Sequence, residues 1–150
     1  MRIEEDTKLD YKDVLIRPKR STLGSRKEVD LQRGYTWRNW QPEDMSMEQI
    51  RSNARHWRGI PIMAANMDGV GTFEIADKLA EAQMFTCLKK TYTVQELVGY
   101  FDDKFSERTQ YVAMSIGITD SDHQKFRDVY EQTGDKLRYV CIDVANGYSN

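Results

Sequence analysis

The sequence predicts an α/β fold in which parallel strands alternate with helices from Gly59 onward. Four short runs rich in apolar residues recur at roughly 25-residue intervals, and a polar turn and an amphipathic helical pattern follow each of the first three. None of the runs alternates apolar with polar residues, so each is expected to be buried on both faces, as parallel strands are. The four runs are residues 60–65, 84–88, 111–116 and 139–145.

Three helices are predicted between these strands, each starting at a side chain that can cap its first turn. Thr72 is expected to cap the first helix and Ser121 to open the third. The second begins with a capping box, in which the Thr93 hydroxyl and the Glu96 carboxylate satisfy free amides. Helical spacing predicts the buried faces, which are Phe73, Ala76, Leu79 and Ala80, then Val94, Leu97, Val98 and Phe101, then Phe126, Val129 and Tyr130.

Repeated strand-helix units of this kind fit either a doubly wound sheet or part of a (β/α)8 barrel. A barrel needs eight strands and about 200 residues or more, whereas the 150 residues here supply four strands. Three arrangements follow: the sequence is the first half of a longer protein, other segments complete the barrel, or the sheet is open. We expect the first. Residues 1–58 are then an N-terminal arm and lead-in, with one short helix capped by Ser46, and residues 59–150 are the first half of the barrel.

Composition narrows the classes of function. The chain is 39% apolar and 31% charged, which is typical of a soluble globular protein, and its net charge of −2 gives no field that would gather a nucleic acid. An acidic start and the lack of a long apolar stretch predict a cytoplasmic protein without a membrane segment. Cys87 and Cys141 lack partners at metal-ligand spacing, so no metal site is assigned and both are expected to be reduced and buried.

Ligands of parallel α/β folds bind where strands end and helices begin, so the loops at those points are the candidate sites. Residues 66–72 combine small side chains with a helix start, and they form either a ligand-binding loop or a tight structural turn. They are not a dinucleotide fingerprint, because the third glycine of that motif falls at Glu74. Lys89 and Lys90 place two cations beyond the second strand, either in a site or at a solvated end.

Asp143 is the most informative polar residue of the four runs. It lies on the same strand face as Cys141 and Ala145, and an unpaired buried carboxylate costs several kcal/mol, so Asp143 must have a partner. The pattern leaves open whether that partner is a ligand or a structural hydrogen-bond donor.

Three segments, in this order, closely resemble GMP reductase: residues 12–21, 59–68 and 140–149. The related IMP dehydrogenases usually carry inserted regulatory domains after the second barrel strand. Only about 20 residues separate Lys90 from Tyr111, which is enough for one helix and too few for such an insertion.

The resemblance implies a (β/α)8 TIM barrel, usually a homotetramer, that converts GMP to IMP and ammonia with NADPH in purine metabolism. The family's cysteine nucleophile and its potassium site follow the sixth strand, which would come after Asn150. We therefore assign neither a catalytic residue nor a metal ligand to this sequence. Two other readings stay open: oxidation of IMP to XMP with NAD, and a non-catalytic nucleotide-binding or assembly partner if the chain ends at Asn150.

The resemblance also implies roles for individual residues. Ser25 and Arg26 match a pair that reaches the NADPH of a neighbouring subunit. Lys90 matches a cofactor-contacting lysine. Asp143, Val144 and Ala145 match a cofactor-contacting segment. Asn66, Met67 and Asp68 match a loop that borders the nucleotide base in the wider family.

The sequence departs from the family pattern at three places. Lys89 and Thr91 replace the histidines that usually flank Lys90, Gly69 replaces a threonine, and residues 41–56 are longer than is typical. These departures are expected in a divergent member whose specificity has changed.

Overall fold

The computed structural model describes residues 6–37, 55–103 and 106–147, and contacts divide the chain into two units, Met1–Asp30 and Leu31–Asn150. The first unit holds two 3-10 turns, η1 (Tyr11–Asp13) and η2 (Arg26–Glu28). Every described residue of this unit is exposed. The predicted separation of an arm from a half barrel after residue 58 stays a prediction, and so does the short helix at Ser46, which lies outside the described residues.

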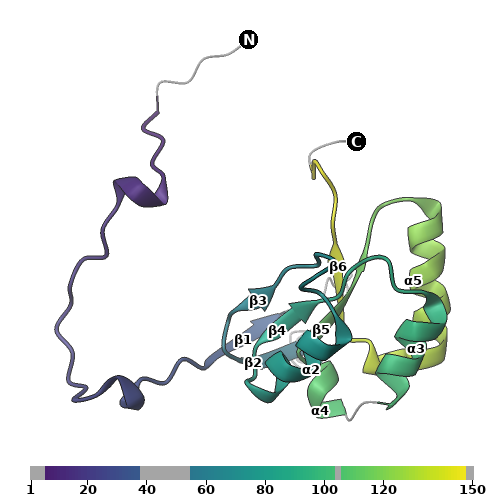
Figure 1. The fold of residues 1–150 in the computed structure, drawn as a ribbon, viewed down its shortest axis with the longest axis horizontal. Coiled ribbons are helices and arrows are strands. Elements are labelled where there is room, and N and C mark those ends of the chain that lie inside the picture. The colour runs from purple at the N-terminus through teal and green to yellow at the C-terminus, as the bar shows by residue number, and fades with distance from the viewer. Residues whose placement is uncertain (1–5, 38–54, 104–105, 148–150) are drawn as a thin grey trace, which may run out of the picture. The chain divides into compact units, whose positions relative to one another are not determined.

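The second unit contains a parallel sheet with helices in its connections (Figure 1). This arrangement confirms the predicted alternation of parallel strands and helices. The strands are β3 (Met63–Ala64), β4 (Phe85–Cys87), β5 (Val112–Ile116) and β6 (Tyr139–Ile142). The helices are α2 (Phe73–Glu81), α3 (Val94–Asp103), α4 (Ser106–Thr109) and α5 (Asp120–Thr133), with the 3-10 turn η3 (Gly134–Lys136) before β6.

The four strands lie in the sheet in the order in which they occur in the chain, β3-β4-β5-β6, and each pairs in parallel with the next. Each connection therefore moves one strand along the sheet in the same direction. A doubly wound sheet reverses direction at a switch point, whereas a (β/α)8 barrel does not. Among the described strands no reversal occurs, so the sheet is compatible with part of a barrel.

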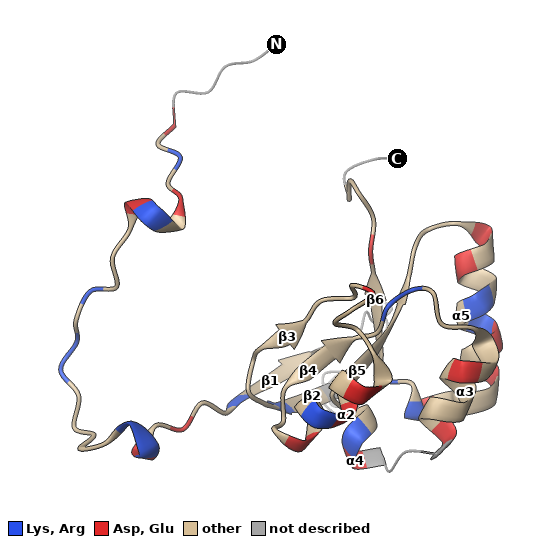
Figure 2. Ribbon diagram, viewed as in Figure 1, with Lys and Arg blue, Asp and Glu red and all other residues tan. Residues whose placement is uncertain are grey.

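Strand β5 divides its side chains between two clusters of buried residues. Val112, Met114 and Ile116 pack in one cluster with the helices, including Phe101 of α3 and Val129 of α5. Burying each such side chain stabilises the fold by about 1.5–3 kcal/mol. No charged residue occurs in β3 to β6, and charged residues lie instead on the helices, the loops and the β1–β2 hairpin (Figure 2).

The second cluster is built around a hairpin that precedes the parallel sheet. Strands β1 (Arg33–Trp37) and β2 (Arg55–Gly59) pair in an antiparallel manner, and Trp57 at the middle of β2 is only 5% exposed. Its ring lies 6.3 Å from that of Phe85 and 6.0 Å from that of Tyr111, centroid to centroid. Because these residues begin or precede β4 and β5, the hairpin contacts the amino end of the sheet.

Two of the predicted helix starts are confirmed and the third is wrong. The Thr72 hydroxyl accepts a hydrogen bond from the amide of Ile75, and Thr93 and Glu96 form both bonds of their box. Helix α5 begins at Asp120, with Thr119 as its cap, and not at Ser121. Thr119 forms a capping box with Asp122, three positions later, so the cap lies two residues before the predicted one.

Burial differs from the prediction at the two outer strands. The run at residues 60–65 was expected to be buried, but Ile62 is 56% and Met63 is 62% exposed. Ile142 of β6 is 63% exposed, and Cys141 is half-buried, not buried. Met63, Cys141 and Ile142 belong to strands that have a paired neighbour on one side only among the described residues, and Ile62 directly precedes β3. Tyr130 was expected to face inward from α5 but is 45% exposed.

No helix in the described ranges is long and apolar enough to cross a membrane.

Candidate functional site

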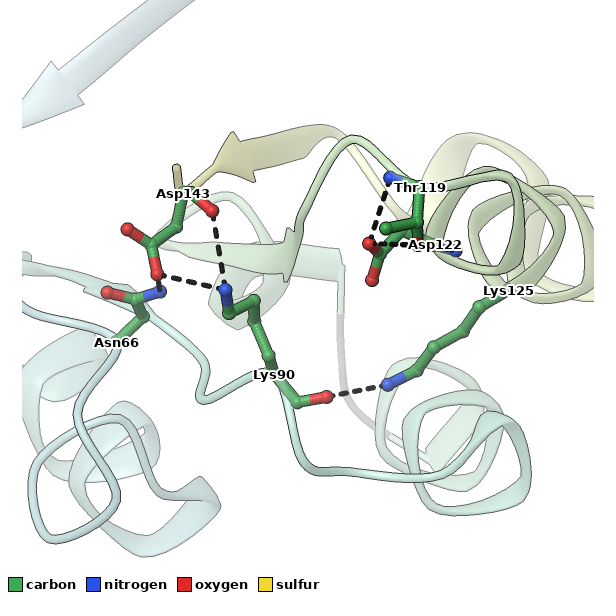
Figure 3. A network of polar contacts seen from close by, with 6 residues as sticks. All are labelled: Asn66, Lys90, Thr119, Asp122, Lys125 and Asp143. Carbon is green, nitrogen blue, oxygen red and sulfur yellow. Dashed lines mark hydrogen bonds and ion pairs between the residues drawn. The ribbon is translucent and has the colours of Figure 1, made fainter. Parts of the chain in front are cut away.

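Three polar residues follow three strands at the carboxyl edge of the parallel sheet. Asn66 follows β3, Lys90 follows β4 and Asp143 follows β6 directly. Because the carboxyl ends of parallel strands lie at the same edge, the fold brings these residues together from positions far apart in the sequence. Figure 3 shows their side chains converging.

Asp143 is the centre of this group. Its Oδ2 accepts a hydrogen bond from Asn66 Nδ2 at 3.0 Å and lies 3.3 Å from Lys90 Nζ. The amide of Asp143 donates to the carbonyl oxygen of Ile116 at 2.9 Å, so its main chain is held beside β5. The hydrogen bond from Asn66, followed by the interactions with Lys90, holds the pKa of Asp143 below its usual range. Asp143 therefore has the partners that the sequence led us to expect, although it lies just after the strand and is half-exposed.

The Lys90–Asp143 pair is accessible to solvent, since the two side chains are 44% and 45% exposed. Lys90 Nζ also donates to the main-chain oxygen of Asp143 at 3.3 Å. An exposed pair of this kind contributes little to stability, typically about 0–1 kcal/mol. Its ammonium and carboxylate remain available to a ligand that approaches this edge of the sheet.

An open hollow of about 580 Å³ adjoins Lys90. It brings together the candidate residues of the first loop and the lysine of the second, and it is lined by Asn66, Met67, Asp68, Gly69, Val70, Lys90 and Thr91. The sequence placed these residues in separate loops, and the tertiary structure joins them in one hollow.

The first loop is a tight turn, which confirms the structural reading of residues 66–72, and its role in ligand binding stays a prediction. The amides of Val70 and Gly71 both donate to the carbonyl oxygen of Met67. Gly71 fits against the second loop so closely that a Cβ atom there would lie 2.5 Å from the Cys87 carbonyl oxygen and 2.8 Å from the Lys89 amide nitrogen. Only glycine allows this approach without displacing the backbone.

The second loop is anchored by aromatic and polar contacts. Lys89 Nζ lies 4.8 Å from the centre of the Tyr92 ring, and that ring stacks on Phe73 at 3.8 Å. The Tyr92 hydroxyl accepts a hydrogen bond from the amide of Phe73. Lys89 therefore contacts an aromatic ring while Lys90 contacts Asp143.

Lys125 of α5 is a contributor that the sequence analysis missed. Its Nζ donates a hydrogen bond to the carbonyl oxygen of Lys90 at 2.7 Å. The sequence held one signal of such a role, because Lys125 precedes the buried Val129 by four positions and so shares its helix face.

The two cysteines do not line the hollow beside Lys90 but a separate apolar one, together with Trp57 and Phe85. Burial, followed by the proximity of Cys141, raises the pKa of Cys87 to about 12. Its sulfur lies 3.4 Å from the sulfur of Met63. A thiolate is the reactive form of cysteine, so Cys87 is a packing residue in this environment. The described ranges contain no group of three or more His, Cys, Asp or Glu residues that could hold a metal ion.

The remaining candidates occupy two different places. Val144 is half-buried and Ala145 is exposed, immediately after Asp143. Ser25 and Arg26 belong to the first unit, where the Ser25 hydroxyl caps η2 by accepting a hydrogen bond from the amide of Lys27 at 3.3 Å. Both side chains are exposed, and their assignment to a cofactor stays a prediction.

Comparison with known proteins supports the resemblance found in the sequence. No protein-family model matches the chain. Over 149 residues it is 44% identical to a GMP reductase of Vibrio vulnificus (strain YJ016) and 43% identical to those of Escherichia coli O81 (strain ED1a) and Escherichia coli (strain K12 / DH10B). Each alignment covers 99% of this chain and 39% of the relative. The chain thus spans well under half the length of the curated relatives it matches, and the predicted resemblance is confirmed over nearly all of the chain.

Proposed function

We propose that this chain, which resembles GMP reductases over 99% of its length, forms the first four strands of a (β/α)8 barrel that converts GMP to IMP and ammonia with NADPH. The observation that carries the proposal is the 44% identity to a GMP reductase. The fold agrees with it, since four parallel strands follow one another without reversal, as barrel strands do.

The charges and hydrogen-bonding groups at the carboxyl edge suit a nicotinamide dinucleotide. NADPH, when bound, supplies the hydride of the reduction. Lys90 offers an ammonium that can donate to carboxamide or phosphate oxygens, and Asp143 offers an acceptor for an amide N–H. Val144 and Ala145 add small apolar surface beside them. Asn66 donates a hydrogen bond to Asp143 and so orients that carboxylate. We place the nucleotide base beside Asn66, Met67 and Asp68 of this loop.

We assign no catalytic nucleophile or metal ligand to these 150 residues. The raised pKa of Cys87 disfavours the thiolate that a covalent mechanism needs. In the proposed enzyme the nucleophilic cysteine and a potassium ion belong to another part of the barrel. A homotetramer, in which Ser25 and Arg26 reach the NADPH of a neighbouring subunit, and a cytoplasmic location complete the proposal.

GMP-dependent oxidation of NADPH tests the proposal directly. The product of the complete native gene is purified, and loss of reduced-nicotinamide absorbance is followed with GMP and without it. Oxidation that depends on GMP and releases IMP and ammonia in equal amounts is expected. Reduction of NAD in the presence of IMP, with no reaction of GMP, would establish the dehydrogenase reaction instead. Binding of nucleotide without turnover in either direction would identify a non-catalytic partner.

A further inference from the structure

Lys125 connects helix α5 to the loop that carries Lys90. Its Nζ donates a hydrogen bond of 2.7 Å to the carbonyl oxygen of Lys90, 35 positions earlier in the chain. The bond crosses from the helix after β5 to the loop after β4, as Figure 3 shows. A hydrogen bond from an ammonium to a carbonyl is among the stronger kinds in proteins.

Two helix caps act on the Lys125 ammonium. Glu96 belongs to the capping box of α3, and Asp122 belongs to that of α5. Burial lowers the pKa of Lys125, and the negative charges of Asp122 and Glu96 oppose that effect. The ammonium is therefore partly removed from water but keeps both a carbonyl partner and favourable charges. These surroundings favour one position for a side chain that would otherwise sample many.

Lys90 is consequently held at two points. Its carbonyl oxygen is bonded to Lys125, and its own ammonium contacts Asp143 at 3.3 Å. The lysine side chain has a flexible four-carbon stem, so the position of its ammonium depends on the position of the main chain that carries it. Fixing the carbonyl restricts the region that the ammonium can reach.

We infer that Lys125 is a positioning residue for Lys90: it fixes the loop after β4 so that the Lys90 ammonium stays beside Asp143 at the edge of the hollow. The consequence for the enzyme rests on the proposed function, in which Lys90 contacts NADPH. The effect of Lys125 on the position of the loop does not depend on the proposed function.

The first test measures the loop without using activity. In the complete protein, Lys125→Met keeps the apolar stem and removes the donor. Amide exchange is followed at Lys89 and Thr93, whose N–H groups bond the Gly71 carbonyl and the Glu96 carboxylate. We expect exchange to accelerate about three- to tenfold, the range that loss of one hydrogen bond gives. Unchanged exchange would overturn the inference.

A matched control separates this effect from the general loss of a lysine. Lys136 also crosses between elements, since its Nζ contacts Asp102 of α3 at 2.6 Å. Lys136→Met is expected to leave exchange at Lys89 and Thr93 unchanged. Equal acceleration in both variants would contradict a specific role of Lys125. Lys125→Arg, which retains a donor, is expected to restore part of the protection.

The second test asks whether Lys125 acts through Lys90. Lys125→Met is expected to raise KM for NADPH about three- to tenfold, but to have no further effect when Lys90 is already alanine. Equal effects in both backgrounds would show that Lys125 acts independently of Lys90 and would overturn the inference. If Lys90→Ala leaves NADPH use unchanged, the cofactor assignment fails, and the exchange experiment still decides whether Lys125 holds the loop.

Discussion

Asp143 accepts contacts from Asn66 and Lys90 through a single oxygen atom, Oδ2. Its second carboxylate oxygen carries no such contact from either residue. Two contacts to one oxygen restrict the orientation of the carboxylate, as the proposed role of Asp143 in binding the cofactor would require. The three residues come from three loops, so they are close together because the parallel sheet brings those loops to one edge and not because of the local sequence.

Removing the Lys90 ammonium tests the assignment of this pair. Lys90→Ala deletes a donor to Asp143 and, in our proposal, to NADPH. Loss of a hydrogen bond to a charged group predicts a fall in kcat/KM for NADPH of about tenfold to a hundredfold. Steady-state kinetics of the complete enzyme measures it. Lys78→Ala, which removes an exposed lysine paired with Glu81, serves as the control, and unchanged kinetics in Lys90→Ala would remove the cofactor assignment.

Gly71 sets the distance between the first and second loops. A methyl group there would meet the Cys87 carbonyl at 2.5 Å, so Gly71→Ala is expected to destabilise the protein by about 1–3 kcal/mol through backbone displacement. Gly69→Ala is the matched control, because a Cβ at Gly69 meets nothing within 4 Å. The midpoints of urea unfolding compare the two variants. Equal unfolding midpoints for the two variants would show that the first and second loops can move apart without loss of stability.

At the scale of elements, the helices after β4 and β5 begin with the same device. Thr93 with Glu96 starts α3, and Thr119 with Asp122 starts α5. In each box the carboxylate satisfies an amide that has no partner within the helix. Both starts adjoin the carboxyl edge of the sheet, so the caps fix the helix ends and the loops of the site together.

Titration of Asp122 should therefore affect stability. Hydrogen bonds from Thr119 hold the pKa of Asp122 below its ordinary value. A depressed folded-state pKa contributes stability above the unfolded-state pKa, and that contribution is lost as the pH falls through the folded-state value. Asp122→Asn is thus expected to lower the unfolding midpoint at neutral pH and to approach the parent protein below about pH 4.

The pH comparison needs a variant that changes charge in the same turn. Asp120→Asn removes a neighbouring carboxylate that is not the capping residue of the box. We expect Asp120→Asn to show a smaller loss at neutral pH. Unfolding midpoints measured from pH 3 to pH 7 decide the matter, and a pH-independent difference for Asp122→Asn would refute the titration argument.

At the scale of the whole molecule, the sheet presents apolar side chains on its outer strands. Ile62, Met63 and Ile142 are each more than half exposed within the described chain. Side chains of this kind are usually buried in parallel sheets, because helices or further strands cover them. The proposed barrel accounts for their exposure, since its remaining strands would extend the sheet beyond β3 and β6.

The proposed contact of Ser25 and Arg26 with the NADPH of a neighbouring subunit makes a prediction about mixtures of variants. Arg26→Ala and Lys90→Ala each damage a different part of the cofactor site. If Arg26 acts on a neighbouring subunit, a tetramer assembled from both variants contains some sites with both residues intact. Co-expression should then recover a measurable part of the parent activity, as determined from NADPH oxidation by the co-purified mixture. Activity no greater than that of either variant alone would place Arg26 in its own subunit's site or outside the site altogether.

The sequence by itself determined the four strands and the three main helices after Gly59, because period, caps and the absence of alternation are local properties, but it missed the β1–β2 hairpin and α4. It placed the helix starts at Thr72 and Thr93, and it identified Asp143 as a residue that needs a partner. It misplaced the start of α5 because Ser121 and Thr119 both resemble caps locally. The order of the strands and the absence of a reversal depend on pairing between distant segments, which no local signal specifies.

Only the tertiary structure decided which residues meet. Asn66, Lys90 and Asp143 lie in three loops, and parallel pairing brings the ends of those loops to one edge of the sheet. Burial of the runs at residues 60–65 and 139–145 was predicted from their composition, but burial depends on what lies across each face. The contact of Lys125 with the Lys90 carbonyl could not be predicted from the sequence either, because packing and not sequence spacing decides which helix residue bonds to which loop.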